Sequence, residues 1–367
     1  MNVLFDHQAF ALQEYGGLSR YFFELIENAK ESREVKLDLS LIYSNNEYLD
    51  NQSLGKPHPF FPGKKFRGKG RLMMLLNQIY SSQVIRKNDF DILHATYYDT
   101  YFLKYLKGKP FTITFLDMIH EKFVSQFPEL GIDKKICNNK KLLIGEAPKV
   151  ITISQATKND LVDIYGVSAD KIDVIHLGSS FNADIGSGKR LHEDPYLLFV
   201  GSRSSYKNFK ICLEAIADTL KSGKISLVCA GGGDFSQEER DLVGLHGLKH
   251  LVKFYKINNS RLANFYKNAE AFIFPSFYEG FGIPVLEAFS CGAPCLLSTG
   301  GSLPEVGGDA VLYFDPYDAS SITGAVEKVL NDKVLRQELS NKGAERLKLF
   351  SWEKTVMQTI EFYHSLI

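Results

Sequence analysis

The sequence has few cysteines and no excess charge of either sign, and each absence excludes a class of protein. Its five cysteines are an odd number without any C-x-x-C pair, which argues against a disulfide framework and a zinc ribbon. The 43 lysine and arginine residues equal the 43 aspartate and glutamate residues, so no overall field attracts nucleic acid. Any anion-binding site must therefore be built locally.

The sequence also lacks the features of a membrane-spanning or exported protein. No run approaches about 18 consecutive apolar residues. The N-terminus, MNVLFDHQAF, carries an acid where a signal peptide needs basic residues followed by an apolar core. These observations predict a cytoplasmic protein.

Length and composition predict a well-packed protein of about two domains. The 367 residues exceed the roughly 250 that one hydrophobic core usually supports. Hydrophobic residues (44%) and charged residues (23%) stand at the globular average, which excludes a disordered or coiled-coil chain. Short apolar runs alternate with helix-length segments, which predicts α/β domains with mostly parallel sheets covered by helices. Such sheets bind ligands at the carboxyl ends of their strands.

A segment rich in glycine, serine and charge, residues 177–195, separates two series of strands and helices. We therefore expect an N-terminal Rossmann-like domain over residues 1–180 and a C-terminal one over residues 181–350. The last stretch places apolar residues at helical spacing, which predicts a closing amphipathic helix over residues 351–367 that packs back toward the N-terminal domain.

The strongest motif is PSFYEGFGIPVLEA. Glu279 precedes a Gly-Phe-Gly turn and Glu287 follows two helical turns later, so we expect both carboxylates to face one cleft. Gly280 and Gly282 permit close approach of a ligand, and a helix starting near Pro284 directs its N–H groups and positive dipole end toward the turn. The residues alone leave open a plain glycine turn before an ordinary helix.

This motif resembles the signature of retaining glycosyltransferases of family 4, in which seven residues separate two glutamates. Further segments in family order extend the resemblance over nearly the whole chain: FDHQAFALQEYGGLSRY, FDILHATYYD, FLDMIHE, VITISQATKNDL, GSRSSYKNF and FSWEKTV. The resemblance implies the GT-B fold, with two Rossmann-like domains facing an interdomain cleft. It also implies that Glu279 meets hydroxyls of the transferred sugar and that Glu287 binds the ribose of the nucleotide.

A second motif, GSRSSYKNF, follows the strand YLLFV. Arg203 and Lys207 are separated by a short turn, so two cations can converge on one diphosphate and oppose the charge that builds as it leaves. Without the resemblance, a solvated basic turn is the alternative. Asn208 is suited to capping the following helix. The expected donor-binding residues are Gly17, Arg203, Lys207, Gly280, Phe281, Gly282, Ile283 and Glu287.

The N-terminal half supplies candidates for the reaction centre. His94 ends a strand that we expect to reach the cleft, although most lone histidines are structural. In FLDMIHE, family members commonly have a histidine before the aspartate; this chain has Leu116 there, and Asp117 matches the family's aspartate. The expected catalytic residues are Glu279, Asp117 and His94, with His120 and Glu121 as alternatives for the missing histidine.

Two glycine-rich turns receive different interpretations. Gly16 and Gly17 follow a first strand region and precede a helix, where they could present backbone N–H groups to phosphate. The sequence AGGGDF, residues 230–235, lacks the third glycine of a dinucleotide fingerprint, so we interpret it as a strand-end turn rather than a cofactor site.

Because no Asp-x-Asp pair stands in a metal-like loop and no His/Cys cluster exists, we expect no metal and no cofactor.

Residues 56–71 contain six cations and no acid, with Phe60, Phe61 and Phe66 among them. This composition suits contact with an anionic membrane surface or an anionic acceptor. A solvated, flexible loop is the alternative. Nucleic acid is a weaker third choice, because no recognised nucleic-acid-binding module accompanies the segment.

Together these features predict a retaining glycosyltransferase that moves a hexose from a nucleotide-sugar donor to a glycan or lipid-linked saccharide. Mannose from GDP-mannose is favoured, because GSRSSYKNF and DMIHE resemble bacterial mannosyltransferase-like members. The resemblance implies a front-face reaction in which the leaving phosphate accepts the acceptor's proton. We expect action in the cytoplasm, peripheral at the inner face of the plasma membrane if the basic segment binds lipid. A nucleotide-sugar epimerase of the same architecture and a non-catalytic nucleotide- or glycan-binding protein are the alternatives; Leu116 favours the latter.

Overall fold

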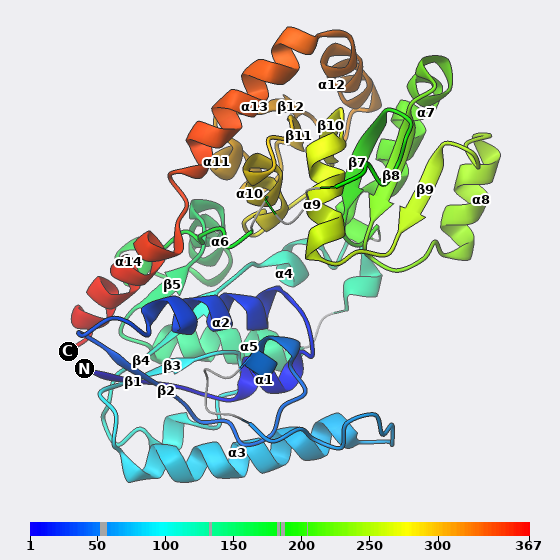
Figure 1. Ribbon diagram of the computed structural model, residues 1–367. Helices are drawn as coiled ribbons and strands as arrows, with labels where there is room; N and C mark the ends of the chain where they lie inside the picture. Colours follow the sequence, from blue (N-terminus) through cyan, green and yellow to red (C-terminus); the bar gives the residue numbers. More distant parts are fainter. Residues whose placement is uncertain (52–56, 132–133, 182–183, 185–187, 204) are drawn as a thin grey trace. The chain divides into compact units, whose positions relative to one another are not determined.

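The computed structural model describes residues 1–51, 57–131, 134–181, 184, 188–203 and 205–367. The chain divides into two units, each containing a six-stranded parallel sheet (Figure 1). Unit 1 spans residues 1–121, 132–178 and 352–367, and unit 2 spans residues 122–131 and 179–351. The predicted α/β fold with parallel sheets is confirmed. No helix in the described ranges is long and apolar enough to cross a membrane.

The sheet of unit 1 has the strand order β2-β1-β3-β4-β5-β6. Its strands are β1 (Asn2–Phe5), β2 (Lys36–Leu39), β3 (Ile92–Ala95), β4 (Phe111–Phe115), β5 (Val150–Thr152) and β6 (Ile172–Val174). The central strands are buried throughout, as β4 (FTITF) illustrates, because a parallel sheet is covered on both faces. The strand order reverses between β1 and β3, so a topological switch point, which we call the crossover, lies at their carboxyl ends.

The helices of unit 1 connect these strands. They are α1 (Gln8–Leu12), α2 (Gly17–Ala29), α3 (Lys69–Lys87), α4 (Ile119–Phe123), α5 (Lys134–Glu146), α6 (Gln155–Tyr165) and α14 (Trp352–His364), with short 3-10 turns η1 (Glu47–Asn51), η2 (Leu103–Tyr105) and η4 (Ala169–Lys171). The boundary between the units falls inside α4, since Glu121 belongs to unit 1 and Lys122 to unit 2. Lys56, the first cation of the basic segment, lies outside the described residues.

The sheet of unit 2 has the strand order β9-β8-β7-β10-β11-β12. Its strands are β7 (Tyr196–Val200), β8 (Ser226–Ala230), β9 (Val252–Tyr255), β10 (Ala271–Phe274), β11 (Cys295–Ser298) and β12 (Leu312–Phe314). Its helices are α7 (Phe209–Gly223), α8 (Gln237–Leu245), α9 (Asn259–Asn268), α10 (Ile283–Ser290), α11 (Leu303–Gly307), α12 (Ala319–Asn331) and α13 (Lys333–Leu347), with η3 (Pro128–Leu130) and η6 (Ser205–Lys207). The order reverses between β7 and β10.

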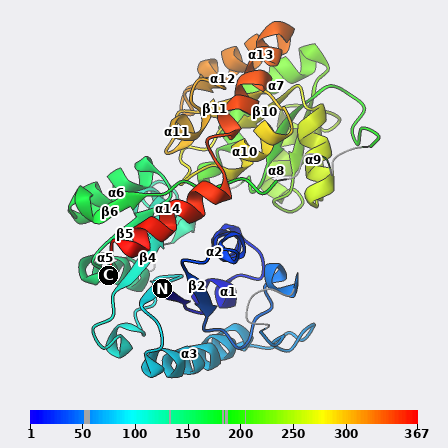
Figure 2. The ribbon, with the colours of Figure 1, turned by 60° about the vertical axis from the view of Figure 1, so that its left-hand side comes forward.

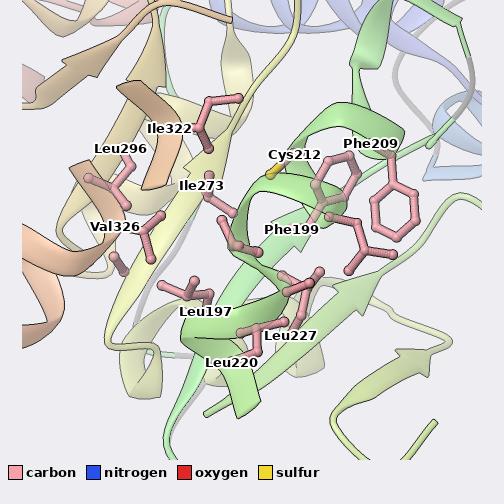
Figure 3. Packing of buried hydrophobic residues seen from close by; sticks show 14 of the residues in the cluster. Leu197, Phe199, Phe209, Cys212, Leu220, Leu227, Ile273, Leu296, Ile322 and Val326 are labelled. Atoms are coloured by element: carbon pink, nitrogen blue, oxygen red, sulfur yellow. The ribbon is translucent and has the colours of Figure 1, made fainter. Parts of the chain in front are cut away.

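A continuous apolar core holds the sheet of unit 2 against α7 and α12 (Figure 3). The buried side chains include Leu197 and Phe199 of β7, Leu227 of β8, Ile273 of β10, Leu296 of β11, Cys212 and Leu220 of α7, and Ile322 and Val326 of α12. Close packing of this kind has few voids and low compressibility. It therefore fixes the strand ends from which the loops of the candidate site emerge.

The last helix, α14, belongs to unit 1 and packs beside α2 (Figure 2). The Tyr363 hydroxyl lies 2.7 Å from Nδ1 of His94, and the Thr355 hydroxyl donates to the carbonyl of His176 at 2.7 Å. Trp352, the only tryptophan, is buried near Tyr21. Apolar packing and specific hydrogen bonds therefore both attach the helix.

Candidate active site

The candidate site of unit 2 lies where the strand order reverses. The loops after β7 and β10 leave adjacent strands there, and ligands of open α/β sheets bind at such crossover points. The first loop contains Lys207 and the second contains Glu279, which are 72 positions apart in sequence. The sheet therefore brings the two strongest sequence motifs together.

Lys207 and Glu279 form an ion pair. Nζ of Lys207 lies 2.7 Å from Oε1 of Glu279, with the lysine side chain 20% exposed and the glutamate side chain 10% exposed. Burial opposes the charge of Lys207, but the charge and hydrogen bond of Glu279 outweigh it and raise the pKa of Lys207 above its ordinary value. Lys207 is thus a cation at neutral pH that keeps a limited path to solvent.

Backbone and amide hydrogen bonds join the two loops. The N–H of Phe277 donates to the carbonyl of Tyr206 at 2.8 Å. Asn208 stands at the predicted N-cap position of α7, but its side chain makes no capping hydrogen bond, and its amide instead donates to the carbonyls of Pro275 and Pro316 at 3.1 and 2.8 Å. Asn208 adopts a left-handed conformation with φ of 59°, which orients it for this contact.

A third loop, after β11, supports the Glu279 backbone. The N–H and the hydroxyl of Ser302 both donate to the Glu279 carbonyl, at 3.1 and 3.0 Å. A Cβ atom at Gly301 would lie 2.4 Å from that same carbonyl oxygen, and a Cβ at Gly300 would lie 2.2 Å from the Phe277 carbonyl oxygen. The two glycines are therefore required for this close backbone approach.

Helix α10 begins after Glu279 rather than containing it. Gly282 is its N-cap with φ of 107°, Ile283 is its first residue, and Pro284 occupies the first turn, where a missing N–H removes no helical bond. The premise that helical turns connect Glu279 to Glu287 is wrong, because Glu279 lies four residues before the helix; that both carboxylates face one cleft stays a prediction. The helix instead presents its N-terminal end to the turn that carries Glu279.

Glu287 is buried on α10. Its carboxylate accepts a hydrogen bond from the hydroxyl of Tyr266 at 3.3 Å. Burial, followed by the charge of Glu287, raises the pKa of Tyr266 well above its ordinary value, so the hydroxyl remains a donor. The carboxylate is therefore held in a defined orientation.

The turn between Glu279 and Glu287 offers main-chain atoms rather than side chains to a ligand. Phe281 is buried with its ring against Phe350, with centroids 5.8 Å apart, and its carbonyl accepts from the Ser302 hydroxyl at 2.8 Å. Gly280 is buried and Ile283 is half-buried. We expect these positions to meet a ligand through main-chain atoms.

Arg203 has a different set of partners from Lys207. Its guanidinium pairs with Glu239 at 2.9 Å and donates to the carbonyls of Gly231, Gly233 and Asp234 at 3.0, 2.8 and 3.2 Å. The side chain is 2% exposed. The structure therefore does not bring the two predicted cations together: Arg203 braces the turn after β8, and direct contact with a diphosphate stays a prediction that requires an exchange of partners.

The turn braced by Arg203 is the predicted strand-end turn. Gly231, Gly232 and Gly233 all have φ between 74° and 83°. A Cβ at Gly232 would lie 2.2 Å from the carbonyl oxygen of Gly201, in the loop after β7. The glycines thus allow two neighbouring loops to pack closely, and the interpretation as a turn is confirmed.

A segment from the first half of the sequence, residues 122–131, packs on the site loops of unit 2. The ring of Phe127 stacks on Phe277 at 5.7 Å, and Phe123 contacts Tyr278 at 5.6 Å. The Ser205 hydroxyl donates to Glu129 at 2.7 Å. We name residues 122–131 the clip segment, because it touches both loops that carry the ion pair. The sequence analysis missed this segment, since nothing in its composition indicates which of the two units it packs against.

His94 is a packing residue of unit 1. The ring is fully buried, with Nδ1 bonded to Tyr363 and Nε2 2.9 Å from the hydroxyl of Thr114. Burial lowers the pKa of His94 to about 3, so it is neutral at physiological pH. A ring with both nitrogens engaged and no exposure does not meet a substrate, and this corrects the expectation that His94 is catalytic.

The residues after β4 have separate environments. Asp117 is half-buried and its Oδ1 accepts from the N–H of Ile119 at 3.1 Å, at the start of α4. Glu121 forms a buried ion pair with Lys140 at 2.9 Å, so its carboxylate is engaged in holding α4 against α5. His120 is exposed and Leu116 is half-buried. Of these, Asp117 stays the candidate for contact with substrate.

Gly17 is the first residue of α2 in unit 1, and it is exposed.

At the crossover between β1 and β3, a buried polar cluster that the sequence analysis missed centres on Asp6. Its Oδ1 accepts from the Thr96 N–H at 2.9 Å, and its Oδ2 accepts from the side-chain amide of Gln8 at 2.6 Å. Only the position of Asp6 and Gln8 at a strand end could have indicated the cluster.

Two family models match adjoining parts of the chain. The model described as Glycosyltransferase Family 4 matches residues 15–180, and that described as Glycosyl transferases group 1 matches residues 181–346. The second match contains the Lys207–Glu279 pair and α10.

Two curated proteins illustrate the sequence similarity. The chain is 27% identical over 302 residues to the uncharacterized glycosyltransferase MJ1607 of Methanocaldococcus jannaschii, covering 76% of each chain. It is 29% identical over 236 residues to O-antigen chain mannosyltransferase B of Escherichia coli, covering 61% of this chain and 62% of that protein.

A solved structure shares the fold. Anabaena Alr3699/HepE, crystallised with UDP and glucose, superposes with a TM-score of 0.75 at 17% identity, covering 99% of each chain. The two family models in tandem identify the chain as a member of the family 4 type of glycosyltransferases, and the structural similarity shows the GT-B fold.

Proposed function

We propose that this glycosyltransferase moves a hexose from a nucleoside diphosphate sugar to a glycan or lipid-linked saccharide, with retention of anomeric configuration. The observation that supports this most is the Lys207–Glu279 pair beside the N-terminus of α10. A cation, a helix N-terminus and a carboxylate at one crossover point suit a ligand that carries both phosphates and hydroxyls.

Each group has a separate role in the proposal. Lys207 and the N–H groups of the first turn of α10 meet the diphosphate, where negative charge grows as the leaving group departs. Glu279 accepts hydrogen bonds from the hydroxyls of the sugar, and Glu287 accepts them from the ribose. In unit 1, Asp117 and Gly17 stay the predicted contacts for the sugar and the phosphates.

In the proposed reaction the bond between the anomeric carbon and the phosphate oxygen breaks while the acceptor oxygen bonds to the same face. The leaving phosphate oxygen takes the acceptor's proton, so no carboxylate nucleophile is needed. We also propose that the reaction needs no metal, because Lys207 and α10 supply the positive charge. Activity in excess chelator is the expected result, and activity that is abolished by chelation and restored by magnesium or manganese would contradict it.

For the donor we propose GDP-mannose. The support is the similarity to O-antigen chain mannosyltransferase B and to other bacterial mannosyltransferases. Alr3699/HepE was crystallised with UDP and glucose, so a UDP-linked sugar is the other donor that the test must distinguish from GDP-mannose.

Thermal unfolding of the purified protein with GDP, UDP and ADP tests the proposal. A diphosphate at about 100 times its Kd stabilises the fold by about 2.7 kcal/mol, and we expect this from GDP alone. Stabilisation by UDP alone would indicate a UDP-linked sugar as the donor in place of GDP-mannose, and it would leave the proposed glycosyltransferase activity unchanged. Stabilisation by none of them would contradict the proposal. Release of GDP from GDP-mannose that requires a saccharide acceptor then separates transfer from epimerisation and from binding without catalysis.

A further inference from the structure

Helix α3 of unit 1 buries polar side chains between the apolar Met73 and Ile85, and it exposes an apolar stripe where an ordinary surface helix is polar. Asn77 and Ser81 face inward and are fully buried. Leu72, Leu75 and Ile79, spaced three and four positions apart, are 41%, 53% and 49% exposed. Residues at this spacing form one stripe along the helix, so the exposed stripe is apolar over about two turns.

Hydrogen bonds fix this orientation. Oδ1 of Asn77 accepts from the N–H groups of Ile42 and Tyr43 at 3.1 and 2.9 Å, and its Nδ2 donates to the Tyr43 carbonyl at 2.8 Å. The Ser81 hydroxyl lies 2.6 Å from that of Ser40. Rotating the helix to bury its leucines would leave these buried groups without partners, so the apolar stripe is held outward.

The loop before α3 extends this surface. Phe60 is buried with Met73 and anchors the loop, while Phe61 and Phe66 are 47% and 44% exposed, with their ring centroids 5.6 Å apart. Phe61 has φ of 46°, a conformation that a bulky residue rarely adopts, and its carbonyl accepts from Nζ of Lys69 at 3.0 Å. The loop is therefore held in a shape that directs two aromatic rings outward.

The same stretch is strongly basic. No aspartate or glutamate occurs from residue 57 to residue 88, and this stretch holds seven cations: Lys64, Lys65, Arg67, Lys69, Arg71, Arg86 and Lys87. All are exposed except Lys69, which is half-buried. In a chain of zero formal net charge this is a local positive field beside an apolar stripe.

We propose that the exposed stripe of α3 and the loop of residues 57–68, together called the α3 face, bind the surface of an anionic bilayer. Phosphate head groups complement the cations, and the acyl boundary accommodates the leucines and phenylalanines. A nucleic acid would leave the apolar stripe in water. A soluble protein partner would need a surface that is both acidic and apolar. An anionic bilayer has both properties, in its head groups and its acyl chains.

Vesicle co-sedimentation tests the proposal without depending on the glycosyltransferase reaction. The probes are vesicles of phosphatidylcholine and of equal parts phosphatidylcholine and phosphatidylglycerol, at low and high salt. We expect binding to the mixed vesicles that weakens with salt and little binding to phosphatidylcholine alone. Absence of binding to the mixed vesicles, or equal salt-insensitive binding to both, would overturn the proposal.

Two sets of substitutions separate the apolar and cationic contributions. Leu72→Ser with Leu75→Ser and Ile79→Ser removes the stripe, and Lys64→Ser with Lys65→Ser and Arg67→Ser removes exposed charge. Each set should weaken vesicle binding about tenfold or more at unchanged unfolding temperature. Leu245→Ser, at an 81% exposed leucine of unit 2, is the matched control and should bind as the parent does. Parent-like binding by both sets would overturn the proposal.

A fluorescent reporter distinguishes a bilayer from a protein partner. Because Trp352 is buried, Phe66→Trp adds one exposed tryptophan, whose emission should shift to the blue with mixed vesicles. An unshifted emission would overturn the proposal. Self-association of the pure protein that the leucine substitutions abolish would instead assign the α3 face to a second copy of the chain.

Discussion

Nζ of Lys207 lies 2.7 Å from Oε1 of Glu279, and this pair joins the loops that follow the two strands at the crossover of unit 2. The loops are also joined through the backbone, between Phe277 and Tyr206. Substitution of Lys207 should therefore affect ligand binding at both loops.

The two glutamates should contribute differently. Glu287→Gln should weaken binding of a sugar-free nucleoside diphosphate, because the proposed contact is with ribose. Glu279→Gln should mainly lower kcat with the full donor, since its contact is with the group that is transferred. Calorimetry with the free diphosphate and steady-state kinetics with the donor measure the two effects. Equal losses of diphosphate affinity in both variants would reject this division.

Arg203→Ala should lower the free energy of unfolding by about 3 kcal/mol, because it leaves the carboxylate of Glu239 and three carbonyls of the turn after β8 without their shared donor. Arg203→Lys should recover only part of the loss, as an ammonium cannot make the same fork of bonds. Urea denaturation measures this. A variant of parental stability that has lost diphosphate affinity would instead support direct contact with the ligand.

His94 should make the protein acid-sensitive. Its folded-state pKa, about 3, lies below the unfolded value near 6.5, so the unfolded state binds more protons between these values. Stability from this residue is present above the unfolded pKa and is lost as pH falls toward the folded pKa, by about 1.4 kcal/mol per unit. His94→Asn should be less stable near neutral pH but should lose less on acidification. Parallel pH profiles of unfolding for the two proteins would contradict the buried, neutral ring.

The clip segment should position the site loops. Phe127→Ala removes a ring stacked on Phe277 and should raise the KM for donor several-fold, as an aromatic pair contributes about 0.5 to 1.5 kcal/mol. Phe66→Ala, at an exposed ring of unit 1, is the control and should leave KM for a soluble acceptor and donor unchanged. If Phe127→Ala changes thermal stability but neither KM nor kcat, the clip segment has a purely structural role.

The sequence predicted the elements whose signals are local. The parallel strands, the turn before α10 and the turn after β8 follow from apolar runs, glycine and proline. Contacts between distant residues carry no such signal: the partner of His94 is Tyr363, and that of Arg203 is Glu239. The N-cap position of Asn208 was predicted, but the partners of its side chain were not, since capping is a local rule and its acceptors, Pro275 and Pro316, lie far along the chain.

The most direct test of the central claim is a double-mutant cycle on the ion pair, measuring GDP affinity for Lys207→Ala, Glu279→Gln and the double variant, with Lys210→Ala as an exposed control on α7. We expect Lys207→Ala to weaken binding by about 1.5 to 3 kcal/mol, with a non-additive double variant and a control at parental affinity. Unchanged GDP affinity in Lys207→Ala, or an equal loss in Lys210→Ala, would show that the diphosphate does not bind at the Lys207–Glu279 pair.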